Sequence, residues 1–320
     1  MTQNRTPLIK PSTRAYWQQA RQKEGFSFFD RLHGYVYARW IYLYIGLGSG
    51  RHPLAKKLGP PLARLGKKLI LLFGKEENRH RGNSKERITF ADTYHGKVLP
   101  LQSAKEMVMV NEDINLPDLE KVIPYKSARE IVLQNPDHIA VLDCPCRMAQ
   151  EDPCTPMDVC LVIGEPFASF VLEHQPEHSR WITPQEAVNI IQAEEERGHV
   201  HHAFFKDAML GRFYAICNCC SCCCAAIHAH QSGTPMLASS GYVAQVDEDQ
   251  CVACGLCADY CQFEALSLND NAITINRAAC MGCGACVSHC PQDALSLHRD
   301  PGKGEPLEIQ NLMQQVLNNA

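Results

Sequence analysis

The cysteines constrain this chain more than any other residue type. There are 18 of them in 320 residues, and none precedes Cys144. They fall into three groups: four between Cys144 and Cys160, six between Cys217 and Cys224, and eight between Cys251 and Cys290. This length does not fit a small secreted disulfide scaffold, and the polar start of the chain does not fit a signal peptide. Crowded thiols in such a long chain indicate bound metal.

An internal repeat with an offset of 29 residues covers positions 251–297. Both copies have the spacing C-x-x-C-x-x-C-x-x-x-C and continue into Ala-Leu-Ser-Leu. Three thiolates two residues apart wrap three corners of a 4Fe–4S cube, and the fourth reaches the other cube. Zinc binds four thiolates without needing this spacing. We therefore expect one cluster on Cys251, Cys254, Cys257 and Cys290, and a second on Cys280, Cys283, Cys286 and Cys261. Gly255 and Gly284 allow the two loops to turn.

Residues 242–301 resemble the bacterial-type two-cluster ferredoxins. The resemblance implies a ferredoxin-like β-α-β fold in two pseudo-symmetric halves and a role in passing single electrons. The residue pattern predicts terminal strands at Tyr242–Val246 and 295–298, with a central hairpin at 266–275 that turns at 269–271. The family's proline after the fourth cysteine is present as Pro291 but is Gln262 in the first half. We expect Gln262 in place of proline to alter the local geometry or the reduction potential of one cluster, and not to prevent that cluster from binding.

Residues 88–241 are predicted to form a cysteine-rich α/β domain. Ile139–Asp143 and 213–216 read as strands that run into cysteine loops, and 159–163 reads as a third strand. Each cysteine loop precedes a helix. In open α/β sheets, ligands collect beyond the carboxyl ends of the strands, where both loops would lie.

Helices in this domain are predicted from capping and periodicity. Thr183 and Glu186 have the spacing of a capping box, with Gly198 at the end of the helix that they start. Two further helices are predicted at 124–133 and 166–173.

Ten cysteines in this domain are more than core packing explains. We expect a subset of them to bind one or two further iron–sulfur clusters, with zinc or redox-active thiols as the alternatives. If 217–224 were helical, its six cysteines would lie on different faces and could not all bind one cluster. The candidate ligands are Cys144, Cys146, Cys154, Cys160, Cys217, Cys219, Cys220, Cys222, Cys223 and Cys224.

Two short motifs in the same domain extend the comparison. Cys144-Pro-Cys146-Arg147 and Cys217-Asn-Cys219-Cys220 resemble little-characterised iron–sulfur proteins of anaerobic microbes, which implies anaerobic, reductive metabolism. Histidines gather nearby, and a neighbouring pair on a predicted strand must face opposite ways. One of them could ligate or protonate at a cluster, although ordinary hydrogen-bonded histidines fit the pattern better. The histidines are His199, His201, His202, His228 and His230. There is no haem-attachment motif, phosphate loop or dinucleotide fingerprint.

The first 87 residues form a basic region with 18 Lys/Arg against 5 Asp/Glu, whereas the rest of the chain has 13 against 30. Leucines at three- and four-residue steps over 54–72 predict an amphipathic helix broken at two prolines. Residues 35–48 are apolar but too short and too charged to span a bilayer. A peripheral membrane contact and a helical subdomain packed on the body both fit this pattern, and the second is favoured. Nucleic acid is not expected. Residues 302–320 are predicted to end in a docked helix.

These features favour a cytoplasmic electron carrier, or one peripheral to the inner face of the membrane. Residues 242–301 hold 8 Asp/Glu against 2 Arg, which suits a basic face on a redox partner protein. One alternative is an oxidoreductase whose substrate binds at an iron–sulfur or thiol centre of the middle domain, with Arg147, His201 or His202 at its wall. A metal or redox sensor is the other alternative. The sequence shows no recognisable catalytic acid–base pair, so it does not decide whether the chain is itself an enzyme.

Overall fold

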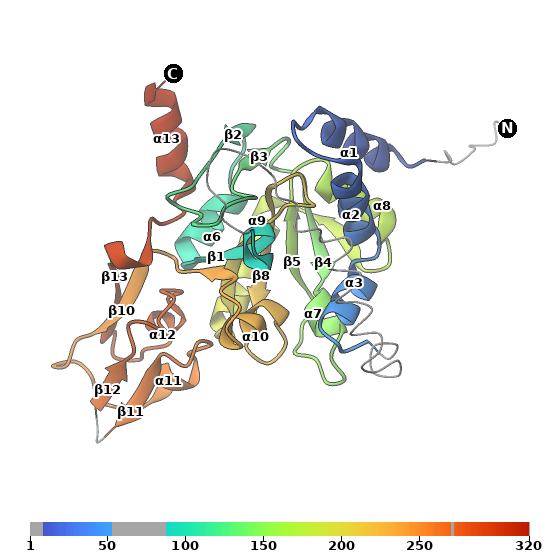
Figure 1. The fold of residues 1–320 in the computed structure, drawn as a ribbon. Coiled ribbons are helices and arrows are strands. Elements are labelled where there is room, and N and C mark those ends of the chain that lie inside the picture. Colours follow the sequence, from blue (N-terminus) through green and yellow to red (C-terminus); the bar gives the residue numbers. More distant parts are fainter. Residues whose placement is uncertain (1–8, 53–87, 270–271, 320) are drawn as a thin grey trace.

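The computed structural model describes residues 9–52, 88–269 and 272–319 (Figure 1). A seven-stranded sheet with strand order β6-β4-β5-β8-β7-β1-β9 lies at the centre. All its pairs are antiparallel except β1 with β9. The strands of this sheet are β1 (Tyr94–Leu99), β4 (Ile139–Asp143), β5 (Asp158–Ile163), β6 (Ser179–Ile182), β7 (Val200–Lys206), β8 (Arg212–Cys219) and β9 (Leu237–Ala238).

Helices cover both faces of this sheet. On one face, α9 packs against β4, β5 and β7, and α6 packs beside it. On the other face, α8 packs against β4 and β5 and is itself covered by α1 and α2. The described helices between residues 11 and 231 are α1 (Pro11–Gln22), α2 (Phe28–Arg39), α3 (Ile41–Gly48), α5 (Phe90–Thr93), α6 (Leu101–Val108), α7 (Pro145–Met148), α8 (Phe167–His174), α9 (Pro184–Glu196) and α10 (Ala225–Gln231).

The predicted strands and two of the predicted helices are confirmed, but the α/β character of the middle domain is not. A sheet built from α/β crossovers would be parallel. Here β4 leads to β5 through a cysteine-bearing segment, and β7 leads to β8 through a tight turn, so that these neighbours are antiparallel. The sheet is mixed, and the domain has α+β character. Because β4 and β8 both run antiparallel to β5, their carboxyl ends nevertheless lie at the same edge.

The helix predicted at 124–133 is wrong. Ala128 has a φ of 53°, which a right-handed helix does not allow. The apolar residues that follow form β3 (Ile131–Leu133), which pairs with β2 (Ile114–Leu116). The apolar run is thus too short for its periodicity to distinguish a strand from a helix.

The start of α9 forms only half of the predicted capping box. Thr183 accepts a hydrogen bond from the backbone of Glu186. The carboxylate of Glu186, however, accepts from Arg180 at 2.6 Å instead of reaching back to the cap. A cation on the neighbouring strand β6 therefore outcompetes the backbone N–H for this carboxylate.

Residues 242–301 form a smaller unit with its own hydrophobic cluster (lower left in Figure 1). Its outer strands β10 (Tyr242–Val246) and β13 (Leu295–Arg299) are paired, and so are β11 (Leu266–Asn269) and β12 (Ala272–Ile275). The short helices α11 (Leu256–Asp259) and α12 (Ala285–Ser288) follow the cysteine loops. The tip of the predicted hairpin turn, 270–271, lies outside the described residues.

Segments near both ends of the described chain pack on the main core. Tyr16 and Tyr37 are buried, so the inner faces of α1 and α2 belong to the main core. A 3-10 turn (Pro301–Lys303) leads to α13 (Ile309–Asn319), whose Ile309 is buried while Val316 is exposed. The predicted docking of the tail thus holds for the first turns of the helix. The amphipathic helix predicted over 54–72 lies outside the described residues.

None of the helices in the described part of the chain is both long enough and apolar enough to cross a membrane.

Candidate metal centres

Two cavities in the C-terminal unit are lined by cysteines from both halves of the repeat. One cavity is bordered by Cys251, Cys254 and Cys257 of the first half and by Cys290 of the second. The other cavity is bordered by three cysteines of the second half and one of the first. The cysteines of that second cavity are Cys280, Cys283, Cys286 and Cys261. Every one of the eight cysteines of the repeat therefore reaches a cavity wall.

The backbone of both loops is shaped to turn the thiols inward. Gly255 and Gly284 have φ values of 83° and 93°, a left-handed conformation that other residues adopt only with strain. Backbone N–H groups point at sulfur in both halves: Ala265 donates to Cys261 at 3.2 Å, and Ala294 donates to Cys290 at 3.3 Å. Such N–H groups stabilise negative charge on sulfur.

Burial disfavours the thiolate form of three cysteines in this unit. Burial raises the pKa of Cys257 and Cys283, and it raises the pKa of Cys286 to about 12 with a contribution from Cys280. A buried thiol loses its proton readily only when a metal cation replaces it. Four convergent thiols with inward N–H donors are the donor set that 4Fe–4S clusters use, so these residues fit the predicted group.

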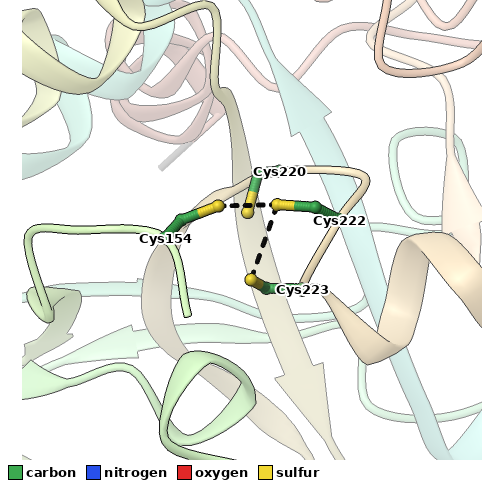
Figure 2. A group of neighbouring side chains, drawn as sticks. All are labelled: Cys154, Cys220, Cys222 and Cys223. Atoms are coloured by element: carbon green, nitrogen blue, oxygen red, sulfur yellow. Dashed lines mark hydrogen bonds between the residues drawn. The ribbon is translucent and has the colours of Figure 1, made fainter. Parts of the chain in front are cut away.

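A third set of cysteines meets at the edge of the middle sheet (Figure 2). The Sγ atoms of Cys154, Cys220, Cys222 and Cys223 all lie within 4.8 Å of one another. The Sγ atoms of Cys154 and Cys222 are 2.6 Å apart, and those of Cys222 and Cys223 are 3.5 Å apart. We call these four residues the Cys154 group. Cys154 comes from the loop after α7, and the other three come from the turn between β8 and α10.

The Cys154 group is half open to solvent. Cys220 and Cys223 are buried, whereas Cys222 is exposed. Burial would raise the pKa of Cys154, but hydrogen bonds from Cys222, Cys223 and Cys220 outweigh burial and lower that pKa. Burial raises the pKa of Cys222 to about 12. The thiol of Cys154 is thus the preferred site of negative charge in the group, and its neighbours donate hydrogen bonds to it.

A buried ion pair stands beside the Cys154 group. Arg147 and Glu194 are each 1% exposed, and Arg147 Nη2 lies 2.6 Å from Glu194 Oε2. Burial would lower the pKa of Arg147, but Glu194 outweighs it and raises that pKa, with Cys144 and Cys220 adding to the effect. The Nε of Arg147 has no hydrogen-bond partner. This cation therefore adjoins thiols from both cysteine loops of the middle domain.

Gln262 joins the C-terminal unit to the Cys154 group. Its Nε2 donates to the carbonyl of Gly198 at 2.9 Å, and its Oε1 accepts from the backbone N–H of Ser221 at 2.7 Å. Ser221 lies between two members of the Cys154 group, and Gln262 follows Cys261 of the second cavity. Proline at this position would have no side-chain amide to make these bonds. The departure at Gln262 was visible in the sequence, but its role as a bridge was not.

Some of the nearby histidines have hydrogen-bond partners for their ring nitrogens, and others have a buried ring nitrogen without one. His201 lies 2.6 Å from Asn218 and 3.1 Å from Glu195, and His199 lies 2.7 Å from Glu194. His228 accepts from Arg51 at 2.7 Å. In contrast, His202 is fully buried with no partner on either ring nitrogen, and Nδ1 of His230 also has none. His201 and His202 face opposite sides of β7, as predicted.

The remaining cysteines of the middle domain lie on β5 and β8 and at the starts of α7 and α10. The structure places none of them in the Cys154 group, so the ten cysteines do not form one site. They are Cys144, Cys146, Cys160, Cys217, Cys219 and Cys224. Cys217 and Cys219 belong to strand β8, so the helical arrangement considered for 217–224 does not occur there.

Comparison with known proteins identifies one part of the chain. No curated protein and no solved structure matches it, so the resemblance of the middle domain to iron–sulfur proteins of anaerobes stays a prediction. Residues 244–297 match the family model described as the 4Fe-4S dicluster domain. The chain therefore carries a 4Fe–4S dicluster domain at its cysteine repeat.

Proposed function

We propose that this chain is an iron–sulfur electron-transfer protein that passes single electrons between its dicluster domain and a redox partner protein. The observation that carries the proposal is the pair of cavities in residues 242–301, each bordered by three cysteines of one half and one of the other. We assign these two sets of four cysteines as the cluster ligands. When bound there, 4Fe–4S clusters accept and release one electron each without needing a catalytic acid or base.

The Cys154 group is proposed as a further iron–sulfur centre. Four thiols close together form a complete ligand set, and Gln262 holds their loop against the dicluster domain. Zinc also takes four thiolates, at a metal–sulfur distance of about 2.3 Å. Zinc would fill the same four thiolates but could accept no electron, so an electron-transfer role of this group requires iron there. The group does not show the incomplete cysteine set that a substrate-binding iron requires, so we do not propose the enzyme alternative.

The charge of the dicluster domain supports a basic partner. Its carboxylates outnumber its cations by 8 to 2, and cluster thiolates add negative charge. Opposite charges accelerate the encounter of two proteins, and this acceleration falls with ionic strength. We therefore propose that the dicluster domain docks to a basic surface.

The N-terminal helices are proposed as a peripheral membrane contact. Their inner faces pack on the sheet, but Phe28, Phe29, Trp40, Leu43 and Leu47 are exposed on α2 and α3. Aromatic and leucine side chains next to basic residues are the composition of helices that lie in a bilayer interface.

The test of electron transfer uses the full chain purified without oxygen. Electron paramagnetic resonance of the dithionite-reduced protein should show reduced 4Fe–4S clusters. The reduced protein should then reduce cytochrome c, a basic one-electron acceptor, at a rate that falls at least severalfold between 20 and 300 mM salt, on the order expected for electrostatic steering. The control is a neutral viologen acceptor, whose rate should change little. A protein with no reducible cluster signal would refute the proposal, and a salt-independent rate would refute the acidic docking face.

A further inference from the structure

The six cysteines outside the Cys154 group converge on one face of the central sheet. Cys217 and Cys219 are two residues apart on β8, so their side chains point to the same face. Cys160 of β5 is the register partner of Cys217, which places it beside them on that face. The sheet alone therefore brings three thiols together.

The other three thiols come from the two helix starts at the same edge. Cys144 is the N-cap residue of α7, Cys146 lies in its first turn, and Cys224 is the N-cap residue of α10. Because β4 and β8 finish at the same end of the sheet, both helices begin at that end. The two predicted units of strand, cysteine loop and helix therefore place their cysteines at the same end of the sheet.

The six thiols contact one another in a closed sequence. Cys160 lies close enough to interact with Cys217 and with Cys144, and Cys146 interacts with Cys144 and with Cys224. Cys224 interacts in turn with Cys219, which interacts electrostatically with Cys217. We call this set the thiol ring. Four of its members are buried, and the thiols of Cys146 and Cys217 pack against the same core.

His202 provides a second, independent observation at this ring. It is the register partner of Cys217 on β7, so its side chain lies on the face of the ring. Directly opposed residues of neighbouring strands have Cβ atoms roughly 5 Å apart. His202 is 0% exposed, and neither of its ring nitrogens has a hydrogen-bond partner. A buried imidazole without partners is costly unless something that the protein binds completes it.

We propose that the thiol ring is a second metal–sulfur centre of the middle domain, holding an iron–sulfur cluster separate from that of the Cys154 group. Its six thiolates exceed the four that one cube requires, and His202 faces the bound cluster with a ring nitrogen. Ordinary core packing accounts for one or two buried cysteines, which then contact carbon. Here six thiols from four segments contact each other.

The surroundings of the ring fit a buried anionic group. The phenol of Tyr42 lies near Cys160 and Cys144, and the phenols of Tyr94 and Tyr214 lie near Cys217. Arg147 interacts with Cys144 of the ring and with Cys220 of the Cys154 group. Its unpartnered Nε lies in this region as a spare donor. A guanidinium N–H is a donor that stabilises charge on cluster sulfur.

The experiment counts iron and acid-labile sulfide in the full chain, enriched with ⁵⁷Fe and purified without oxygen. The dicluster domain and a cube at the Cys154 group together account for about 12 irons, so we expect about 16 in the unaltered protein. In the variant Cys144→Ala/Cys160→Ala/Cys217→Ala, which leaves only three ring thiols, we expect the loss of about four irons and of one Mössbauer component. The matched control, Cys154→Ala/Cys222→Ala, should keep that component and lose a different one.

The outcomes separate this proposal from the proposed function. An unaltered protein with about 8 irons, a ring variant that keeps all of its iron, or zinc in the ring overturns the thiol ring as an iron–sulfur centre. Loss of the same Mössbauer component in both variants also overturns it, because the two sites would then be one. The dicluster resonance of the reduced protein reports separately on electron transfer. It serves with far-UV circular dichroism as the check that each variant is folded.

Discussion

Gln262 shows how one side chain can decide which parts of the molecule touch. It stands where ferredoxins have proline, and its amide bonds both Gly198 and Ser221. A hydrogen bond of this kind contributes about 1 kcal/mol net, and leaving its buried partner unpaired costs more. The residue therefore holds the Cys154 group in register with the dicluster domain.

We predict that Gln262→Ala loosens this contact without removing iron from the dicluster domain. Hydrogen exchange over 217–224 should become roughly fivefold faster, because the N–H of Ser221 loses its acceptor. The matched control is Gln292→Ala, which alters an exposed glutamine of the other half. Equal exchange in the two variants, measured by mass spectrometry, would show that Gln262 does not anchor the loop.

Lys97 illustrates a charge held away from water. It is 1% exposed, and its Nζ donates to the carbonyl of Glu305 at 2.7 Å. Burial, with repulsion from Arg299, lowers the pKa of Lys97 to about 7 from its ordinary 10.5. Between these two values the unfolded chain binds a proton that the folded chain does not, so this residue makes stability rise with pH.

The expected result is a stability difference that depends on Lys97 and on pH. From pH 7.5 to 9 the unaltered protein should gain at most about 1.4 kcal/mol per pH unit relative to Lys97→Met, in which the titrating group is absent. Below about pH 7 the two slopes should coincide, because Lys97 is protonated in both states there. Denaturant unfolding followed by far-UV circular dichroism measures both slopes. Parallel curves above pH 7.5 would contradict the buried, neutral state.

At the scale of elements, α2 and α3 have two different faces. Tyr37 and Ile41 are buried in the main core, while Phe28, Phe29 and Trp40 are exposed. The sequence pattern indicated either packing on the body or contact with a membrane, and the described helices are arranged so that both can occur.

We predict that the exposed face binds anionic vesicles. The full chain should co-sediment with vesicles containing phosphatidylserine, and Phe28→Ser/Phe29→Ser should reduce binding about a hundredfold, since two aromatic side chains that enter the interface contribute about 3 kcal/mol together and each 1.4 kcal/mol is a factor of ten. Leu256→Ser, which removes an exposed apolar residue of the dicluster domain, is the control. Retained binding in the phenylalanine variant would place the contact elsewhere or rule it out.

Elements with strong local patterns were predictable from the sequence, and those that depend on distant partners were not. The helix capped by Thr183 and the strands around the cysteines follow from capping and apolar runs. The strand Ile131–Leu133 was mistaken for helix because its pairing with Ile114–Leu116 is a long-range contact. The division of the middle cysteines into two sets likewise depends on strand register, which places Cys160 opposite Cys217.

Across the whole molecule, charge and cofactor sites are segregated. The basic residues concentrate before residue 88 and the carboxylates after it. Lys23, the C-cap residue of α1, forms an ion pair with Glu130, with 2.7 Å between Nζ and Oε2. Composition predicted this asymmetry. It could not predict that the dicluster domain lies against α9 and the β8–α10 turn, because that arrangement depends on single contacts such as those of Gln262.

The crossed cysteine sets of the dicluster domain also fix the topology of its chain. Under the proposed ligand assignment, one cluster would tie Cys257 to Cys290, and the other would tie Cys261 to Cys280 inside that loop. The two clusters would then close two nested loops, and closing a long loop removes much of the freedom of the unfolded chain. Neither half of the repeat can be released while either closure persists. If oxidation removed one cluster, the second would still hold the two halves together. The domain would then unfold as one unit when the second cluster is lost.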